Sequence, residues 1–182
     1  MYEVEVKVRA DHETVRGALA DLGAESAGTV AQTDTYLDAP HRDFAATDEA
    51  LRIRRETADG EETVAVTYKG PLVEAASKTR EEHETAVADG EATREIFESL
   101  GFRPAATVRK ERERFTVGEF TVSLDDVTDL GEFVEVETAV RSEDEVAERR
   151  EVAYDLLRDL GLDPDEQVRT AYLGLLLEDS PE

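Results

Sequence analysis

The N-terminal stretch Glu3-Val4-Glu5-Val6-Lys7-Val8-Arg9 alternates strictly between charged residues and valine. A period of two is the pattern of a β-strand with one apolar face and one charged face. The same alternation returns as Lys78-x-Arg80-x-Glu82-x-Glu84, as Lys110-x-Arg112-x-Arg114 and as Glu135-x-Glu137. The sequence therefore predicts a sheet whose charged face lies opposite an apolar one.

Turn and helix signals divide the remaining chain into short elements. Asp59-Gly60 is typical of a β-hairpin turn, and Gly70-Pro71 is expected to end a strand. The apolar residues of three or four other segments follow the helical period, and Gly23, Gly101 and Gly161 stand where a helix would stop. We expect strands over 3–9, 29–37, 50–56, 63–69, 77–87, 106–115, 120–125 and 133–140, and helices over 11–22, 91–100, 143–160 and 167–177.

These elements favour an antiparallel β-barrel with helices packed on its outside. The amphipathic helices must bury their apolar stripes, and the apolar faces of the strands are the surface available to them. With about eight strands, closure would enclose the charged faces and remove the exposed edges. An open sheet whose charged face simply meets water is the alternative.

The two signs of charge indicate two kinds of ligand inside such a barrel. Carboxylates spaced by two on a strand share a face and suit a hard cation such as Mg²⁺ or Mn²⁺. Arginine and lysine bind phosphate oxygens. Acids and bases on one enclosed wall therefore indicate a polyphosphate that arrives complexed with metal.

Composition limits the partners. The chain has 182 residues and a formal charge of −24, so we expect no binding to nucleic acid or to anionic membranes. It lacks cysteine and any apolar run long enough to span a bilayer, and its first residues do not resemble a signal peptide, so we expect a cytoplasmic protein. Abundant acid with only four lysines is the composition expected of a cytoplasm rich in salt.

The ordered set of motifs resembles the CYTH superfamily, the triphosphate tunnel metalloenzymes, over residues 1 to about 175. The motifs that carry the likeness are Glu3-x-Glu5-x-Lys7, Gln32-x-Asp34-x-Tyr36, Leu51-Arg52-Ile53-Arg54, Thr67-Tyr68-Lys69-Gly70-Pro71, Lys78-x-Arg80-x-Glu82-x-Glu84, Lys110-x-Arg112, Asp125 and Glu135-x-Glu137. All four lysines fall on motif positions. The stretch His41 to Arg52 looks most like the class IV adenylate cyclase branch, including its archaeal members.

The resemblance implies an α+β fold in which an eight-stranded antiparallel tunnel carries helices on its outside, as a single domain over residues 1–182. It implies that carboxylates bind Mg²⁺ or Mn²⁺: Glu3, Glu5, Asp125, Glu135 and Glu137. It implies that basic residues bind the triphosphate: Lys7, Arg52, Arg54, Lys69, Lys78, Arg80, Lys110 and Arg112. Among these residues it implies direct roles in catalysis for Glu3, Glu5, Lys7, Asp125 and Glu137, with Glu82, Glu84 and Tyr36 assisting the metal or orienting the bases.

Three functions are compatible with this residue set. The first is a metal-dependent conversion of ATP to cyclic AMP and pyrophosphate. The second is hydrolysis of inorganic triphosphate or thiamine triphosphate by the same wall of residues. The third is binding of a nucleotide or polyphosphate without catalysis, which would not require five carboxylates. One departure from several triphosphatases of the family is that the C-terminal region offers only Arg169 as a basic residue. A homodimer is compatible with the sequence, which does not identify the oligomeric state.

Overall fold

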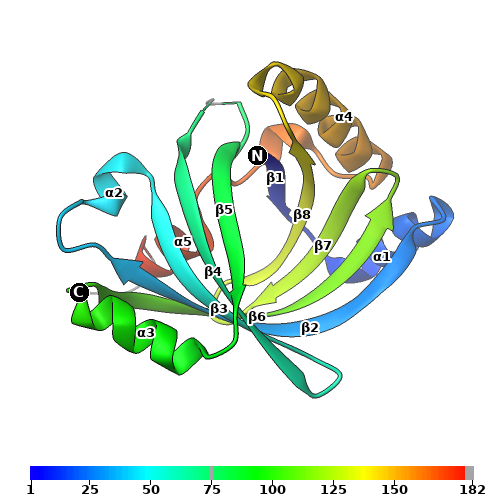
Figure 1. The fold of residues 1–182 in the computed structure, drawn as a ribbon. Coiled ribbons are helices and arrows are strands. Elements are labelled where there is room, and N and C mark those ends of the chain that lie inside the picture. The colour runs from blue at the N-terminus through cyan, green and yellow to red at the C-terminus, as the bar shows by residue number, and fades with distance from the viewer. Residues whose placement is uncertain (74–75, 179–182) are drawn as a thin grey trace.

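The computed structural model describes residues 1–73 and 76–178, and within them eight antiparallel strands close into a barrel (Figure 1). The order around the barrel is β1-β5-β4-β3-β2-β6-β7-β8. The strands are β1 (Tyr2–Arg9), β2 (Glu25–Asp38), β3 (Ala50–Ala58), β4 (Glu61–Leu72), β5 (Arg80–Val87), β6 (Arg103–Val117), β7 (Phe120–Val127) and β8 (Gly131–Val140). The predicted fold class is thus confirmed, and the open sheet is excluded.

The barrel closes through β1, which is bound unequally on its two sides. Its whole length pairs with β8, from Tyr2 opposite Val140 to Arg9 opposite Phe133. On the other side only Tyr2 and Glu3 pair with β5. The loop before β5 continues this seam, since the backbone N–H of Lys78 donates to the carbonyl of Glu5 at 3.2 Å. Lys78 therefore reaches the barrel from a loop that is tied to β1.

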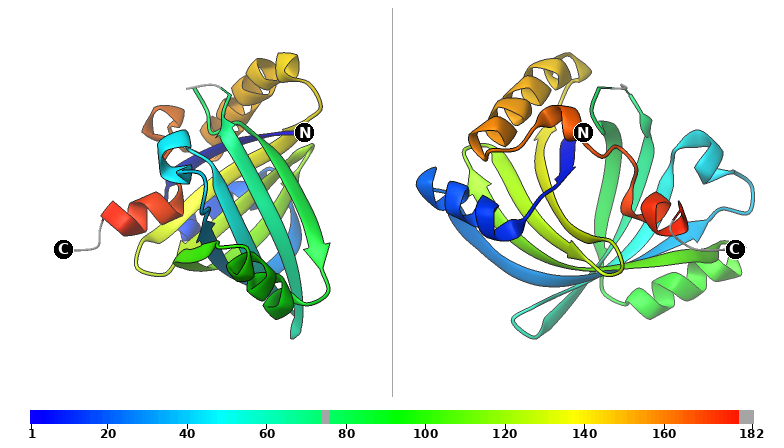
Figure 2. Two further views of the ribbon diagram at one scale, coloured as in Figure 1. Left: turned by 60° about the vertical axis from the view of Figure 1, so that its left-hand side comes forward. Right: turned by 180° about the vertical axis from the view of Figure 1, so that it is seen from behind.

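The helices cover the outside of the barrel and cross one of its ends (Figure 2). They are α1 (His12–Asp21), α2 (Phe44–Thr47), α3 (Gly90–Ser99), α4 (Val146–Asp159) and α5 (Tyr172–Glu178), with short 3-10 turns η1 (Glu143–Glu145) and η2 (Pro164–Glu166). None of the helices in the described part of the chain is long and apolar enough to cross a membrane.

Local sequence explains where the first helix begins and ends. The Asp11 carboxylate caps α1 by accepting from the backbone N–H of Thr14 at 2.9 Å. Val15 and Leu19 lie one turn apart and are fully buried against the outer face of the barrel. Gly23, with a φ of 68°, adopts the left-handed conformation that ends the helix.

The largest core lies between the helices and the outer face of the sheet. Val6 and Val8 of β1, Val134 and Val136 of β8, and Leu157 of α4 are buried together there. Because side chains alternate along a strand, burying the valines of β1 outward turns Glu3, Glu5 and Lys7 toward the barrel interior. The buried valines of β1 thus determine that its charged side chains face the barrel interior.

Three expected boundaries were wrong, and one short helix was not predicted. Strand β4 continues through Gly70 and Pro71 to Leu72, with an irregular register between Lys69 and Leu72 that accommodates the proline. Strand β5 begins only at Arg80, and the last helix begins only at Tyr172, so residues 167–171 form an extended strap. The four-residue helix α2 was not predicted, because four residues are too few for a periodic signal.

Candidate active site

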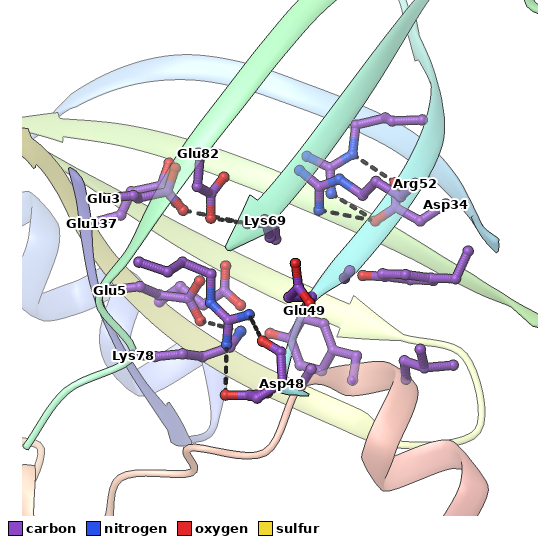
Figure 3. A pocket seen from close by; sticks show the side chains of 18 of the residues that line it. Glu3, Glu5, Asp34, Asp48, Glu49, Arg52, Lys69, Lys78, Glu82 and Glu137 are labelled. Atoms are coloured by element: carbon purple, nitrogen blue, oxygen red, sulfur yellow. Dashed lines mark hydrogen bonds and ion pairs between the residues drawn. The ribbon is translucent and has the colours of Figure 1, made fainter. Parts of the chain in front are cut away.

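The barrel interior contains a cavity of about 1110 Å³ that is lined by charge (Figure 3). Among the described residues, nine acidic and nine lysine or arginine side chains line it. The cavity is therefore balanced in charge, although the whole chain carries −24. Acidity of the surface and balance of the interior have different causes, and only the balanced interior indicates a ligand site.

Arg52 and Arg54 of β3 form one basic part of the wall, and Asp34 of β2 orients both. Asp34 accepts two hydrogen bonds from Arg54, from Nε and Nη2, each at 2.6 Å. An Arg52 nitrogen lies 3.5 Å from the same carboxylate. Burial alone would raise the pKa of Asp34, but Arg52 and the hydrogen bond from Arg54 hold it well below its usual range. The carboxylate thus stays charged and fixes the planes of two guanidinium groups.

Two lysines of the cavity wall are paired with acids. The Lys69 amine donates to Glu82 and lies 3.7 Å from Glu3. The Lys78 amine donates to Glu5 at 3.0 Å. Both lysines line the cavity. Each is therefore available to an anion that replaces its carboxylate partner.

The acidic part of the wall is formed by β1, β5 and β8. Glu5 is directly opposite Glu137 in the register of β1 with β8, and Figure 3 shows Glu3, Glu82 and Glu137 together. Burial, followed by the charges of Glu137, Glu82 and Glu5, raises the pKa of Glu3 to about 7 against the lowering effect of Lys69. Burial and the neighbouring carboxylates also raise the pKa of Glu137. Carboxylates that crowd in this way would be stabilised by an added cation.

No group of three or more Asp, Glu or His side chains within residues 1–73 and 76–178 is already arranged to hold a metal ion. Mg²⁺ in enzymes is commonly held by one or two carboxylates, and phosphate oxygens and water complete its shell. Glu3 and Glu137 supply oxygen donors where neighbouring carboxylates crowd, and Glu5, which pairs with Lys78, supplies another directly opposite Glu137. The donor set therefore fits a hard divalent ion that enters with a phosphate ligand.

Asp125 of β7 lies outside this acidic wall and is fully buried. Both of its oxygens accept from Arg112 at 2.6 Å, and one also accepts from Lys110 and from the Tyr172 hydroxyl, both at 2.9 Å. Arg112 also donates to Glu135. Asp125 is absent from the residues that line the cavity. Its partners identify it as the residue that holds Lys110 and Arg112 in place.

Lys7 also differs in surroundings from the other lysines. Its amine donates to the backbone carbonyl of Thr170 at 2.8 Å and lies 4.0 Å from the centre of the Tyr172 ring. Burial, with a contribution from Lys78, lowers its pKa to about 7. Lys7 is not among the cavity-lining residues and contacts the strap of residues 167–171 instead.

The structure brings most of the predicted site residues to one cavity. Those that line it are Glu3, Glu5, Tyr36, Arg52, Arg54, Lys69, Lys78, Arg80, Glu82, Glu84, Lys110, Arg112, Glu135 and Glu137. Lys7 and Asp125 do not line it. Arg80 lines it but donates to the backbone carbonyls of Asp48 and Gly70, at 2.9 and 3.2 Å.

Residues that the sequence analysis did not assign to the site also belong to it. Asp34 lay within a quoted motif but received no role, although its alternation with Gln32 and Tyr36 on one strand face was a signal. Arg114 lines the cavity and continues the alternation of Lys110 and Arg112. Tyr172 had no detectable signal, because its role depends on how the C-terminal segment crosses the barrel.

Comparisons with known proteins agree with this geometry. The CYTH domain family matches residues 1–172. The protein named "Putative adenylate cyclase MJ0240", of Methanocaldococcus jannaschii, is 40% identical over 176 residues, which are 96% of this chain and 98% of the relative. "Adenylate cyclase CyaB" of Aeromonas hydrophila is 29% identical over 98% of this chain and 90% of the relative. The solved structure of the PH1819 protein from Pyrococcus horikoshii superposes with a TM-score of 0.92 at 38% identity, over 98% of this chain and 99% of that one.

Proposed function

The chain belongs to the CYTH domain family, and on that premise we propose that it is a metal-dependent enzyme that converts ATP to cyclic AMP and pyrophosphate. The observation that carries the proposal is the charge-balanced cavity, in which acidic and basic side chains line one wall and pair with one another. The adenylate cyclase names of two relatives, one of them 40% identical, support ATP as the substrate.

The basic residues would bind the triphosphate by exchanging partners. In the cavity Lys69, Lys78 and Arg52 each lie beside a carboxylate. An incoming phosphate can pair with those cations. The carboxylates that the cations release can then bind divalent ions. A triphosphate with two divalent ions is nearly neutral, so the cavity would keep its balance of charge.

Glu3, Glu5 and Glu137 would hold the divalent ion, Mg²⁺ or Mn²⁺, with Glu135 and Glu82 beside them. When bound, such an ion supplies Lewis-acid stabilisation of the charge on phosphate oxygens. The chain itself positions the basic side chains: Asp34 fixes Arg52 and Arg54, and Asp125 fixes Lys110 and Arg112. Cations held in a water-poor cavity stabilise developing negative charge without having to reorient.

The proposed reaction is an in-line displacement at the α-phosphorus. The ribose 3′ oxygen forms a bond to that phosphorus, the bond to the bridging oxygen of the pyrophosphate breaks, and the hydroxyl proton is released. The products are cyclic AMP, pyrophosphate and a proton. Lys and Arg side chains on the cavity wall would stabilise the charge that grows on the leaving pyrophosphate.

The decisive experiment offers the protein ATP, inorganic triphosphate and thiamine triphosphate separately, with Mg²⁺ or with Mn²⁺, and identifies the products. We expect cyclic AMP and pyrophosphate from ATP, and no turnover when the metal is chelated. ADP or inorganic phosphate as the principal product would show that the protein is a phosphohydrolase and not a cyclase. Binding of ATP without turnover in the presence of either metal would show that the protein binds nucleotides without catalysis, and would refute the proposed enzymatic activity.

A further inference from the structure

One side of the cavity differs from the charged remainder because two helices line it with apolar side chains. Helix α2 contributes Phe44 and Ala45, and helix α5 contributes Leu173 and Leu177. The views in Figures 1 and 2 agree that the two helices lie close to each other at the same end of the barrel. The cavity therefore continues from a charged interior into an apolar mouth.

Helix α5 presents a surface that suits a flat group. Leu173 and Leu177 are four residues apart and so lie on one face of the helix. Gly174 also lines the cavity and adds no side chain between them. A β-carbon at Gly174 would lie only 2.7 Å from Thr170 Cγ2, which makes glycine the residue that fits there. Leu177 is 60% exposed, so apolar surface at the mouth has no partner among residues 1–73 and 76–178.

The same helix is anchored to the charged network. The Tyr172 hydroxyl donates to Asp125 at 2.9 Å, and the Tyr172 ring packs on Phe133 with 4.9 Å between the ring centres. Tyr172 directly precedes Leu173. The apolar wall is thus held in a fixed position relative to Lys110 and Arg112, which Asp125 also binds. A ligand that contacts both the wall and these bases meets a preformed site.

The size of the cavity requires more than phosphate to fill it. Its volume of about 1110 Å³ exceeds the roughly 300–1,000 Å³ typical of sites for drug-sized organic ligands. Inorganic triphosphate would occupy the charged part and leave the apolar mouth in contact with water. An organic group attached to the triphosphate would remove that apolar surface from water.

We propose that Phe44, Leu173 and Leu177 form the subsite for the base of a nucleoside triphosphate, so that α2 and α5 select nucleotides over inorganic triphosphate. This inference rests on the proposed function, since it assumes that the charged part of the cavity binds the phosphates. The base lies between the two helices, with the Phe44 ring on one side and the leucine face of α5 on the other. The selectivity for a base then comes from residues that the phosphate-binding motifs do not contain.

The test compares the wild type with Leu177→Asn in two measurements: kcat/KM for ATP, and the inhibition constants of inorganic triphosphate and thiamine triphosphate as competitors of ATP. Asparagine has the same branching at Cγ but exposes an amide to the base, and Leu177 is too exposed for the change to unfold the protein. We expect kcat/KM for ATP to fall about threefold to tenfold, as loss of part of a leucine contact predicts, and the inhibition constant of inorganic triphosphate to change less than twofold. Phe44→Leu, which keeps an apolar side chain against the outer core, should show the same selective loss.

Leu100→Asn is the matched control, because Leu100 is 65% exposed but lies at the end of α3, away from the cavity. It should change neither kcat/KM for ATP nor the inhibition constant of inorganic triphosphate. Equal losses for ATP and inorganic triphosphate, or no loss for ATP in either mouth variant, would overturn the subsite and leave the proposed enzyme intact. Tighter binding of thiamine triphosphate than of ATP by the wild type would overturn the nucleobase assignment. Absence of any triphosphate turnover would instead refute the proposed function, and this inference with it.

Discussion

The Tyr154 hydroxyl of α4 donates a hydrogen bond to the backbone carbonyl of Ala76 at 2.6 Å. The side-chain amide of Gln167 donates to the same carbonyl at 3.1 Å and also to the Tyr154 oxygen. Ala76 precedes Lys78 by two residues in the loop before β5. An outer helix and the C-terminal strap therefore hold the loop that brings Lys78 to Glu5.

This contact makes Tyr154 a positioning residue for Lys78. We expect Tyr154→Phe to raise KM for the triphosphate about threefold with little change in kcat, because one hydrogen bond of about 1 kcal/mol orders the loop. The effect should vanish in a Lys78→Ala background, since the loop then carries no amine to position. Steady-state kinetics on the single and double variants measure this, and additive effects would reduce Tyr154 to a general structural role.

Substitution of the acidic wall tests the metal assignment. Glu5→Ala or Glu137→Ala should abolish metal-dependent turnover and weaken Mn²⁺ binding, measured by calorimetry, because each removes an oxygen donor from a place rich in negative charge. Glu111→Ala is a suitable control, since Glu111 is exposed on strand β6 and does not line the cavity. Wild-type Mn²⁺ affinity in both site variants would contradict the assignment.

Asp125 should respond differently from those carboxylates. Its oxygens accept from Arg112, Lys110 and Tyr172, so Asp125→Ala leaves the buried Lys110 without its carboxylate partner and Arg112 with Glu135 alone. Breaking a buried pair of this kind costs roughly 3–5 kcal/mol, and we expect a loss of that order in the free energy of unfolding. Mn²⁺ affinity at a temperature where the variant is folded should stay near that of the wild type. A selective loss of Mn²⁺ affinity in Asp125→Ala, with unchanged stability, would instead identify Asp125 as a metal ligand.

The contrast between Asp125 and Glu5 shows which features of the site the sequence alone can predict. Alternation on β1 places Glu3, Glu5 and Lys7 on one face, and burial of the valines on the other face is enough to predict that this charge points inward. Alternation cannot tell how deep in the barrel a residue lies. Lys7 and Asp125 share the inner face with the cavity residues, yet they contact the strap and Tyr172, whose path across the barrel end leaves no periodic pattern. The extended residues 167–171 were predicted as helix for the same reason.

Acid should destabilise the protein in part through Asp34. Its pKa is lower in the folded protein than the value of about 3.9 in an unfolded chain, so its ionised form stabilises the fold above that pH. This contribution is lost as the pH falls from about 4 toward the folded pKa. Urea unfolding at several pH values should show a shallower acid decline in Asp34→Asn, which starts from a lower stability at pH 7. Parallel declines for the two proteins would contradict the assigned shift.

Salt should stabilise the chain through its surface and not through its cavity. The net charge of −24 cannot arise from the cavity wall, where nine acids meet nine bases, so repulsion acts among the carboxylates outside it. Raising salt from 0.1 M to 1 M shortens the screening length from about 10 Å to about 3 Å and should raise the unfolding temperature. Glu13, Asp126 and Glu166 are exposed, and replacing all three with lysine should reduce this dependence on salt. The triple variant should be more stable than the wild type in dilute buffer and similar to it in molar NaCl. A wild type whose unfolding temperature is the same at both salt concentrations would show that repulsion among surface acids does not limit its stability.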